Sequence, residues 1–300
     1  HLGLEALEIN HNQNDQNAFS TEQFHLLIDK WKKSFDLEYG GMARAPKFMM
    51  PSNYEFLLHY AHNYNDQQLL DFVNLTLTKM AHGGLFDTLE GGFSRYSVDM
   101  KWHVPHFEKM LYDNGQLVSL YANAYKLTQN PLYKEVIQKT LQFVSDNFLS
   151  PEKGFFSALD ADSIHHEGHL EEGAFYVWTK EELKNILGND FELFSKVFNI
   201  NDFGHWENQN YVLIQNQELH QIANQNNIST AELATKKRQW EILLLKHRKK
   251  RSQPRLDDKC LCSWNALMLK GYIEAYKALQ DESYLEVALQ NAAFIQAKFM

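Results

Sequence analysis

An internal repeat at an offset of 151 residues constrains the fold of this chain more than any other feature. Residues 114–148 align without a gap to residues 265–299, and eleven of the 35 aligned positions are identical. The identical positions, each matched 151 residues later, are Asn114, Tyr121, Ala124, Tyr125, Lys126, Gln129, Tyr133, Glu135, Val136, Phe143 and Phe148. A weaker copy begins at Asn53, where Tyr60 and Tyr64 follow at the same steps of seven and eleven. Because these steps return to one face of a helix, each copy is predicted to be a helix, a tight turn and a second helix.

A helical hairpin that recurs along a chain predicts an array whose copies bury each other's apolar faces. Such an array is either an open solenoid or a closed ring. The copies here are unevenly spaced, and long loops gathered at one end suit a ring with a cleft better than a regular peptide-binding superhelix. We therefore predict an all-α fold of the α/α-toroid type, with minor β structure in the loops. The expected helices span residues 21–35, 51–62, 67–81, 114–128, 132–148, 190–198, 230–250, 264–280 and 282–299, and a further helix begins at Thr179.

The ends of the sequence suggest the domain organisation. Residues 1–20 are polar and rich in Asn and Gln without a sustained period, which is typical of a tail or linker. We assign residues 21–300 to the toroid domain. The chain begins at His1 rather than Met and stops within a helical pattern at Met300, so we expect a fragment of a longer polypeptide, truncated on the C-terminal side of the toroid.

Charge and composition exclude several partners. The net charge of −9 and the pI of about 5.9 give no electrostatic reason to expect nucleic acid or an anionic membrane. No stretch of about 18 apolar residues or signal pattern occurs, so we expect no membrane partner. The basic run 246–251 is expected at a helix end. Cys260 and Cys262, one residue apart, are expected to be reduced thiols of a cytoplasmic protein.

Residues 82–115 form a loop unusually rich in reactive side chains, and long loops in compact domains are often functional. His103 and His106 lie beside Trp and Pro, which favours fixed positions over free solvation. A catalytic histidine and a structural, hydrogen-bonding one are about equally expected there. Glu108 and Asp113 are acid–base candidates, but either can instead cap the helix that follows.

Other loops carry carboxylates that the toroid would gather at the same end. Distinctive segments precede each repeated asparagine: APKFMMPS, VPHFEKMLYD and LDDKCLCSW. The acidic loop before Thr179 adds Asp160, Asp162, His165, His166, Glu167, His169, Glu171 and Glu172. Asp160 and Asp162 are spaced like the first ligands of a calcium loop, but the Gly and Glu of an EF-hand do not follow them. The histidines resemble metal ligands, but a solvated polar loop explains them more simply, so we expect no metal site.

The signature blocks GGFSRYSVDMKWHVPHFEKMLYDN, LDADS with EEGAFYVWT, and LDDKCLCSWNALM resemble those of the spermatogenesis-associated, thioredoxin-domain-containing family. The resemblance covers roughly residues 36–299. It implies an (α/α)6 toroid akin to the N-acylglucosamine 2-epimerases and the six-hairpin glycosidases. It also implies a thioredoxin-like domain in the full-length chain, on the N-terminal side. This chain contains no Cys-x-x-Cys, so no redox chemistry is assigned to it.

The resemblance also suggests a reaction. The related epimerases use histidines as acid and base, aided by Arg and Glu, to move a proton beside a sugar carbonyl. We therefore expect a sugar epimerase or isomerase that acts on a small-molecule carbohydrate without cofactor or metal. His106 or His103 would be the general base or acid, Glu108 would orient the histidine, and Arg95 would stabilise the enolate.

Two alternatives remain open. The related glycosidases use paired carboxylates, so Asp113, Asp160 or Asp258 could form the acid–base pair of a glycoside hydrolase. A non-catalytic toroid could instead bind a sugar, or a partner protein for the attached thioredoxin domain. In the enzyme readings, Trp102 and Trp264 would stack on sugar rings. The remaining candidate substrate-binding residues are Tyr96, Asp162, Asp257, Asn265 and Lys47.

Overall fold

The computed structural model describes residues 20–165 and 168–300. Residues 1–19 of the tail predicted over residues 1–20, together with His166 and Glu167, lie outside the described residues. The chain divides into two compact units, one ending at Phe35 and the other running from Asp36 to Met300. The first unit contains helix α1 (Thr21–Lys32), which Ser20 and Gln23 cap reciprocally. Within the described ranges, no helix combines the length and the apolar character that a membrane crossing requires.

In the described part of the second unit, the three predicted repeats form helical hairpins. The hairpins are α2 (Pro51–Tyr64) with α3 (Gln67–His82), α4 (Leu111–Thr128) with α5 (Pro131–Asn147), and α10 (Cys262–Leu279) with α11 (Glu282–Phe299). Their turns share one backbone conformation. The first helices are followed by Asn65, Gln129 and Gln280, which have left-handed φ angles of 54°, 54° and 55°. The next residue in each turn caps the second helix through its side chain. The all-α prediction and its repeated hairpins are therefore confirmed.

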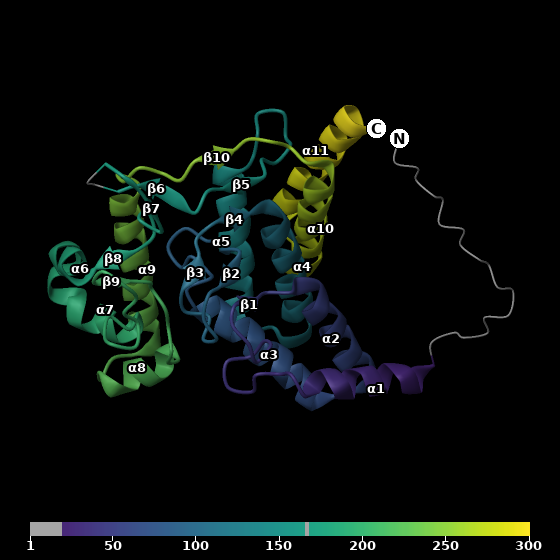
Figure 1. Cartoon of the computed structure of the whole chain (residues 1–300), viewed down its shortest axis with the longest axis horizontal. Coiled ribbons are helices and arrows are strands. Elements are labelled where there is room, and N and C mark those ends of the chain that lie inside the picture. Colours follow the sequence, from purple (N-terminus) through teal and green to yellow (C-terminus); the bar gives the residue numbers. More distant parts are fainter. Residues whose placement is uncertain (1–19, 166–167) are drawn as a thin grey trace, which may run out of the picture. The chain divides into compact units, whose positions relative to one another are not determined.

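The first helices of the three hairpins lie against one another. Helix α4 packs against α2 and, much more extensively, against α10 (Figure 1). Gly115 and Gly271 allow the closest approach, since a Cβ atom on Gly271 would lie only 2.8 Å from the carbonyl oxygen of Gly115. The repeated hairpins therefore pack against one another, as predicted for an array of helical hairpins.

Between α5 and α10 the regular hairpin repeat is interrupted. The intervening elements are α6 (Lys180–Leu187), the short 3-10 helix η1 (Gly188–Asp190), α7 (Phe191–Val197), α8 (Leu219–Gln225) and α9 (Thr230–Arg248). They enclose an apolar core of their own, in which Phe194, Trp240 and Leu244 are buried. The predicted helices at 190–198 and 230–250 thus exist, whereas α8 was not predicted.

Short strands join the loops that precede the hairpins. One sheet has the order β1 (Lys47–Phe48), β2 (Tyr96–Ser97), β3 (Pro105–His106), and another the order β10 (Leu256–Asp257), β5 (Ala158–Leu159), β4 (Lys109–Met110). Two hairpins complete the set: β6 (Asp162–Ile164) with β7 (Leu170–Glu172), and β8 (Trp178–Thr179) with β9 (Asn210–Tyr211). The β10-β5-β4 sheet pairs residues from three loops that are far apart in sequence. The minor β structure predicted for the loops is therefore present.

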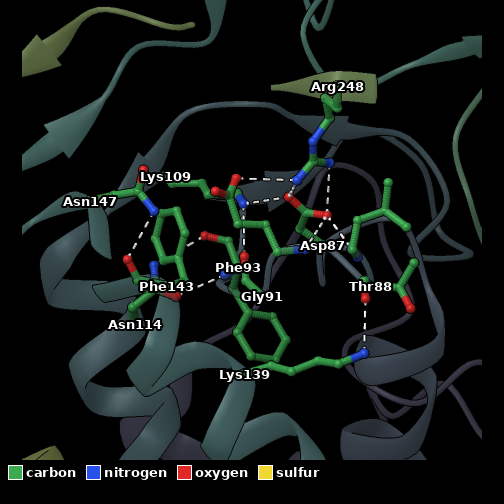
Figure 2. Close-up of polar contacts among 12 residues, drawn as sticks. Asp87, Thr88, Gly91, Phe93, Lys109, Asn114, Lys139, Phe143, Asn147 and Arg248 are labelled. Atoms are coloured by element: carbon green, nitrogen blue, oxygen red, sulfur yellow. Dashed lines mark hydrogen bonds and ion pairs between the residues drawn. The ribbon is translucent and has the colours of Figure 1, made fainter. Parts of the chain in front are cut away.

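A buried ionic cluster fixes the reactive loop to the end of α9. The guanidinium of Arg248 forms two hydrogen bonds to the carboxylate of Asp87, at 2.9 and 2.7 Å, and the ammonium of Lys109 lies 2.8 Å from the same carboxylate (Figure 2). Glu90 also accepts a hydrogen bond from Arg248. Burial would raise the pKa of Asp87, but Arg248 and Lys109 outweigh it and hold that pKa well below its usual range. These charges in the loop therefore have a structural role.

Candidate functional site

His106 lies between two carboxylates. Its Nδ1 is 2.7 Å from Oε1 of Glu172, and its Nε2 is 3.7 Å from Oε2 of Glu108. Strand pairing places Tyr96 directly opposite His106, and the two rings stack with centroids 5.0 Å apart. The imidazole is therefore held on one face by an aromatic ring and faces an acidic group at each nitrogen. This arrangement suits a histidine that accepts and donates protons.

A second acid lies near Arg95 and Glu108. Arg95 donates a hydrogen bond of 3.1 Å to Glu108 and also interacts electrostatically with Tyr112 and Asp113. Asp113, in the first turn of α4, is buried, and its Oδ2 has no hydrogen-bond partner among the residues that the structure describes. Burial raises the pKa of Asp113 to about 7, against the opposing effects of Arg95 and Tyr112. The site thus combines a carboxyl group that titrates near neutral pH with the ion-paired carboxylate of Glu108.

A cavity of about 410 Å³ opens beside Glu108, along the β10-β5-β4 sheet. Asp160, Asp257 and Asp258 line it from two other loops. Asp160 faces Arg255 at 3.4 Å, and Asp257 lies 2.6 Å from Lys259. The Arg255, Lys259 and Asp258 side chains are exposed. The tertiary structure therefore brings the predicted acidic residues of three separate loops to one polar cavity.

Two further candidates lie next to this group. Trp264 contacts the ring of Tyr112 edge-on, with centroids 4.8 Å apart. Asp162 lies opposite Glu172 in the β6–β7 pairing. Both residues are half-buried. They therefore border the cluster of His106, Glu108 and Asp113 rather than forming its centre.

Three residues expected to bind substrate are instead buried in the protein core. Trp102 is fully buried, and its indole Nε1 donates a hydrogen bond of 2.8 Å to the carbonyl of Tyr39. Lys47 is buried and bonded to Asp36 at 2.7 Å, and to two backbone carbonyls. Asn265 is fully buried, with both ends of its amide bonded to the backbone. Their polar atoms are engaged inside the fold, which corrects the expectation that they face a substrate.

The structure separates the two histidines of the His-x-x-His motif. The Nε2 of His103 is 3.1 Å from the carbonyl oxygen of Gly204, and the His103 backbone amide donates to Asp99. Burial lowers the pKa of His103. The printed hydrogen bonds of His103 are therefore with these groups and not with the carboxylates that contact His106.

Sequence reasoning did not select Glu172 or Tyr112 as site residues. Glu172 contacts His106 across 66 positions of the chain, and no local pattern indicates this pairing. The only available signal was that the acidic loop before Thr179 is crowded with carboxylates. Tyr112 adjoins Asp113, so its position at the site could have been inferred from that neighbour.

Comparison with known proteins identifies the relatives of this chain. No family model matches it. It is 35% identical to an uncharacterized protein of Caenorhabditis elegans, over 94% of this chain and 42% of that protein. It is 34% identical to spermatogenesis-associated protein 20 of Homo sapiens, over 88% of this chain and 37% of that protein, and likewise 34% identical to the Mus musculus protein. The chain thus spans about two fifths of the length of these relatives.

Solved structures with a partly similar arrangement of helices include two sugar epimerases and a glycoside hydrolase. A sugar epimerase from a ruminal bacterium is 15% identical, with a TM-score of 0.39, over 90% of this chain and 83% of that one. Cellobiose 2-epimerase from Bacillus thermoamylovorans is 12% identical, with a TM-score of 0.41, over 92% and 87%. A family 76 glycoside hydrolase from Bacteroides thetaiotaomicron is 14% identical, with a TM-score of 0.40, over 91% and 54%. The sequence identities confirm the relationship indicated by the signature blocks: this chain is homologous to one part of spermatogenesis-associated protein 20.

Proposed function

We propose that this chain catalyses proton transfer on a small-molecule carbohydrate, as a sugar epimerase or isomerase, with His106 as the general base. The observation that carries this proposal is the placement of His106, 2.7 Å from Glu172 at Nδ1 and 3.7 Å from Glu108 at Nε2. A histidine whose Nδ1–H is held by a carboxylate presents Nε2 as its basic nitrogen. The sugar class rests on the resemblance of the signature blocks and on the polar cavity beside Glu108.

The other side chains have complementary roles. His106 removes the proton from the carbon beside the sugar carbonyl, and the electron pair moves onto the carbonyl oxygen. Arg95 supplies positive charge to stabilise that enolate. We assign the return of a proton to the opposite face of the enolate carbon to Asp113, because burial raises the pKa of its carboxyl group to about 7. One proton is removed from the carbon and one is returned to it, so the substrate and the product of the epimerisation have the same atoms and charge.

The test follows the transferred proton directly. The chain is incubated with a panel of reducing sugars in D2O, and NMR follows both isomer formation and deuterium incorporation beside the carbonyl. We expect both signals with the unmodified chain and a loss of about 10²–10⁴-fold in His106→Asn. His220→Asn, at an exposed position of α8, is the matched control. Unchanged rates in His106→Asn would overturn the assignment.

A glycoside hydrolase is the second candidate, favoured by the pKa of Asp113. A carboxyl group with a pKa of about 7 near the Arg95-paired carboxylate of Glu108 resembles the acid–base division of glycosidases. Hydrolysis of aryl glycosides or oligosaccharides that Asp113→Asn and Glu108→Gln abolish, without deuterium incorporation, would support this function. Sugar binding without either reaction would support the non-catalytic alternative.

A further inference from the structure

The β6–β7 hairpin places three potential metal ligands on one face. In its antiparallel register Ser163 lies opposite Glu171 and Ile164 opposite Leu170. The backbone amide of His165 continues the ladder by donating to the carbonyl of His169, at 2.8 Å. Residues opposite each other on antiparallel strands project to the same face, and so do residues two apart along one strand. His165, His169 and Glu171 therefore share a face, whereas Glu172, which contacts His106, points to the other.

The distances between the donor atoms are short. Oε2 of Glu171 lies 3.2 Å from Nε2 of His169 and 3.8 Å from Nδ1 of His165. One donor atom from each of the three residues lies within 4.8 Å of the others. Tetrahedral zinc, with bonds of about 2.0–2.1 Å, holds its ligand atoms about 3.4 Å apart. The distances from Glu171 to His169 and to His165 lie on either side of that value, and all three side chains are partly exposed.

We propose that His165, His169 and Glu171 bind one zinc ion. Two imidazoles and one carboxylate are a known ligand set of zinc sites that keep a fourth position for water or another ligand. His165 and Glu171 also line a surface cavity of about 670 Å³, so that the fourth position can open toward solvent. Arg251 lies on the cavity wall, and its guanidinium donates hydrogen bonds to Glu182 and to backbone carbonyls. The sequence alone favoured a solvated loop, because it did not show that Glu171 lies between the two histidines.

Metal binding is measured on the whole 300-residue chain and needs no enzymatic assay. After treatment with chelator, zinc titration by calorimetry and metal analysis after dialysis should give one zinc per chain. Cobalt added in place of zinc should produce the visible bands of a four-coordinate site. We expect His169→Asn and Glu171→Gln to weaken binding by more than roughly tenfold and to remove the cobalt bands.

Control substitutions separate this site from other surface histidines and carboxylates. His220→Asn on α8 and Glu192→Gln on α7 change exposed residues of the same types outside the hairpin. Both controls should bind zinc like the unmodified chain. Because His169 is more than half exposed, its substitution should not unfold the protein, and circular dichroism verifies this. Equal zinc affinity in His169→Asn, Glu171→Gln and the controls would overturn the proposal.

Discussion

Asn114 and Asn265, separated by 151 residues, each hold a preceding loop through the same pair of hydrogen bonds. The side-chain oxygen of each accepts a 2.7 Å hydrogen bond from the backbone amide of a phenylalanine, Phe93 for the first and Phe155 for the second. The amide nitrogen of each donates back to the carbonyl of that phenylalanine, as Figure 2 shows for Asn114. The internal repeat therefore preserves a side chain that fastens a preceding loop onto a helix.

This finding corrects one prediction from the sequence. Helices were expected over residues 114–128 and 264–280, but α4 begins at Leu111 and α10 at Cys262, three residues before Asn114 and Asn265. The asparagines also bond the carbonyl four residues earlier, at 2.8 Å for Asn114 and 3.0 Å for Asn265. Each one thus joins the first turn of its own helix to a distant loop.

Asn114→Ala and Asn265→Ala should each lower the free energy of unfolding by about 2–3 kcal/mol, because the loop amide and carbonyl lose their partners in a fully buried place. Urea denaturation followed by circular dichroism measures this change. Asn224→Ala, at an exposed position of α8, should change the stability very little. Equal effects at the buried and exposed asparagines would contradict the structural role.

Glu172→Gln should slow the proposed reaction by about 10²-fold, because the amide cannot stabilise a protonated His106 as the carboxylate does. The rate constant kcat should fall more than KM changes, since Glu172 acts through the histidine. Glu172→Asp should restore part of the rate. A Glu172→Gln variant with full activity on the sugar panel would show that His106 does not depend on this carboxylate.

Asp113→Asn should stabilise the protein relative to the unmodified chain, and this gain should be larger at high pH than at low pH. Burial raises the folded-state pKa of Asp113 to about 7, whereas the unfolded value is about 3.9. In the unmodified chain, Asp113 therefore does not lower the free energy of unfolding below about pH 4. Between about pH 4 and pH 7 it lowers that free energy progressively, by up to about 4 kcal/mol. Denaturation curves from pH 4 to 8 should show the gain of Asp113→Asn increasing over that range. A gain independent of pH would argue against the raised pKa.

Arg248→Met should lower the free energy of unfolding by about 3–5 kcal/mol. It leaves Asp87 and Glu90 buried with one cation fewer, and the loss of one partner from a buried ion pair is strongly destabilising. Arg255→Met is the matched control, because the Arg255 side chain is 86% exposed. Thermal or chemical denaturation compares the two variants. A small effect at Arg248 would mean that the ionic cluster does not hold the reactive loop.

The repeated hairpins were predictable from the sequence, because their signals are local. The steps of seven and eleven between tyrosines mark one helical face, and the polar turns hold left-handed and capping residues that define the ends of the helices. The grouping of Arg95, His106, Glu108 and Asp113 was predictable for a similar reason, since all four occupy one short stretch.

Only the tertiary structure decided which of these groups face one another. Trp102 and Lys47 resemble substrate-binding residues in the sequence, yet both are buried, because burial depends on neighbours that are remote in the chain. Likewise His103 meets Gly204, whereas His106 meets Glu172. The helical period and the residue types of a turn depend on residues that are close in the sequence, so the sequence alone is enough to predict them. The contacts that orient His106, and those that bring three potential metal ligands together, depend on strand pairing. No local sequence pattern specifies which strands pair.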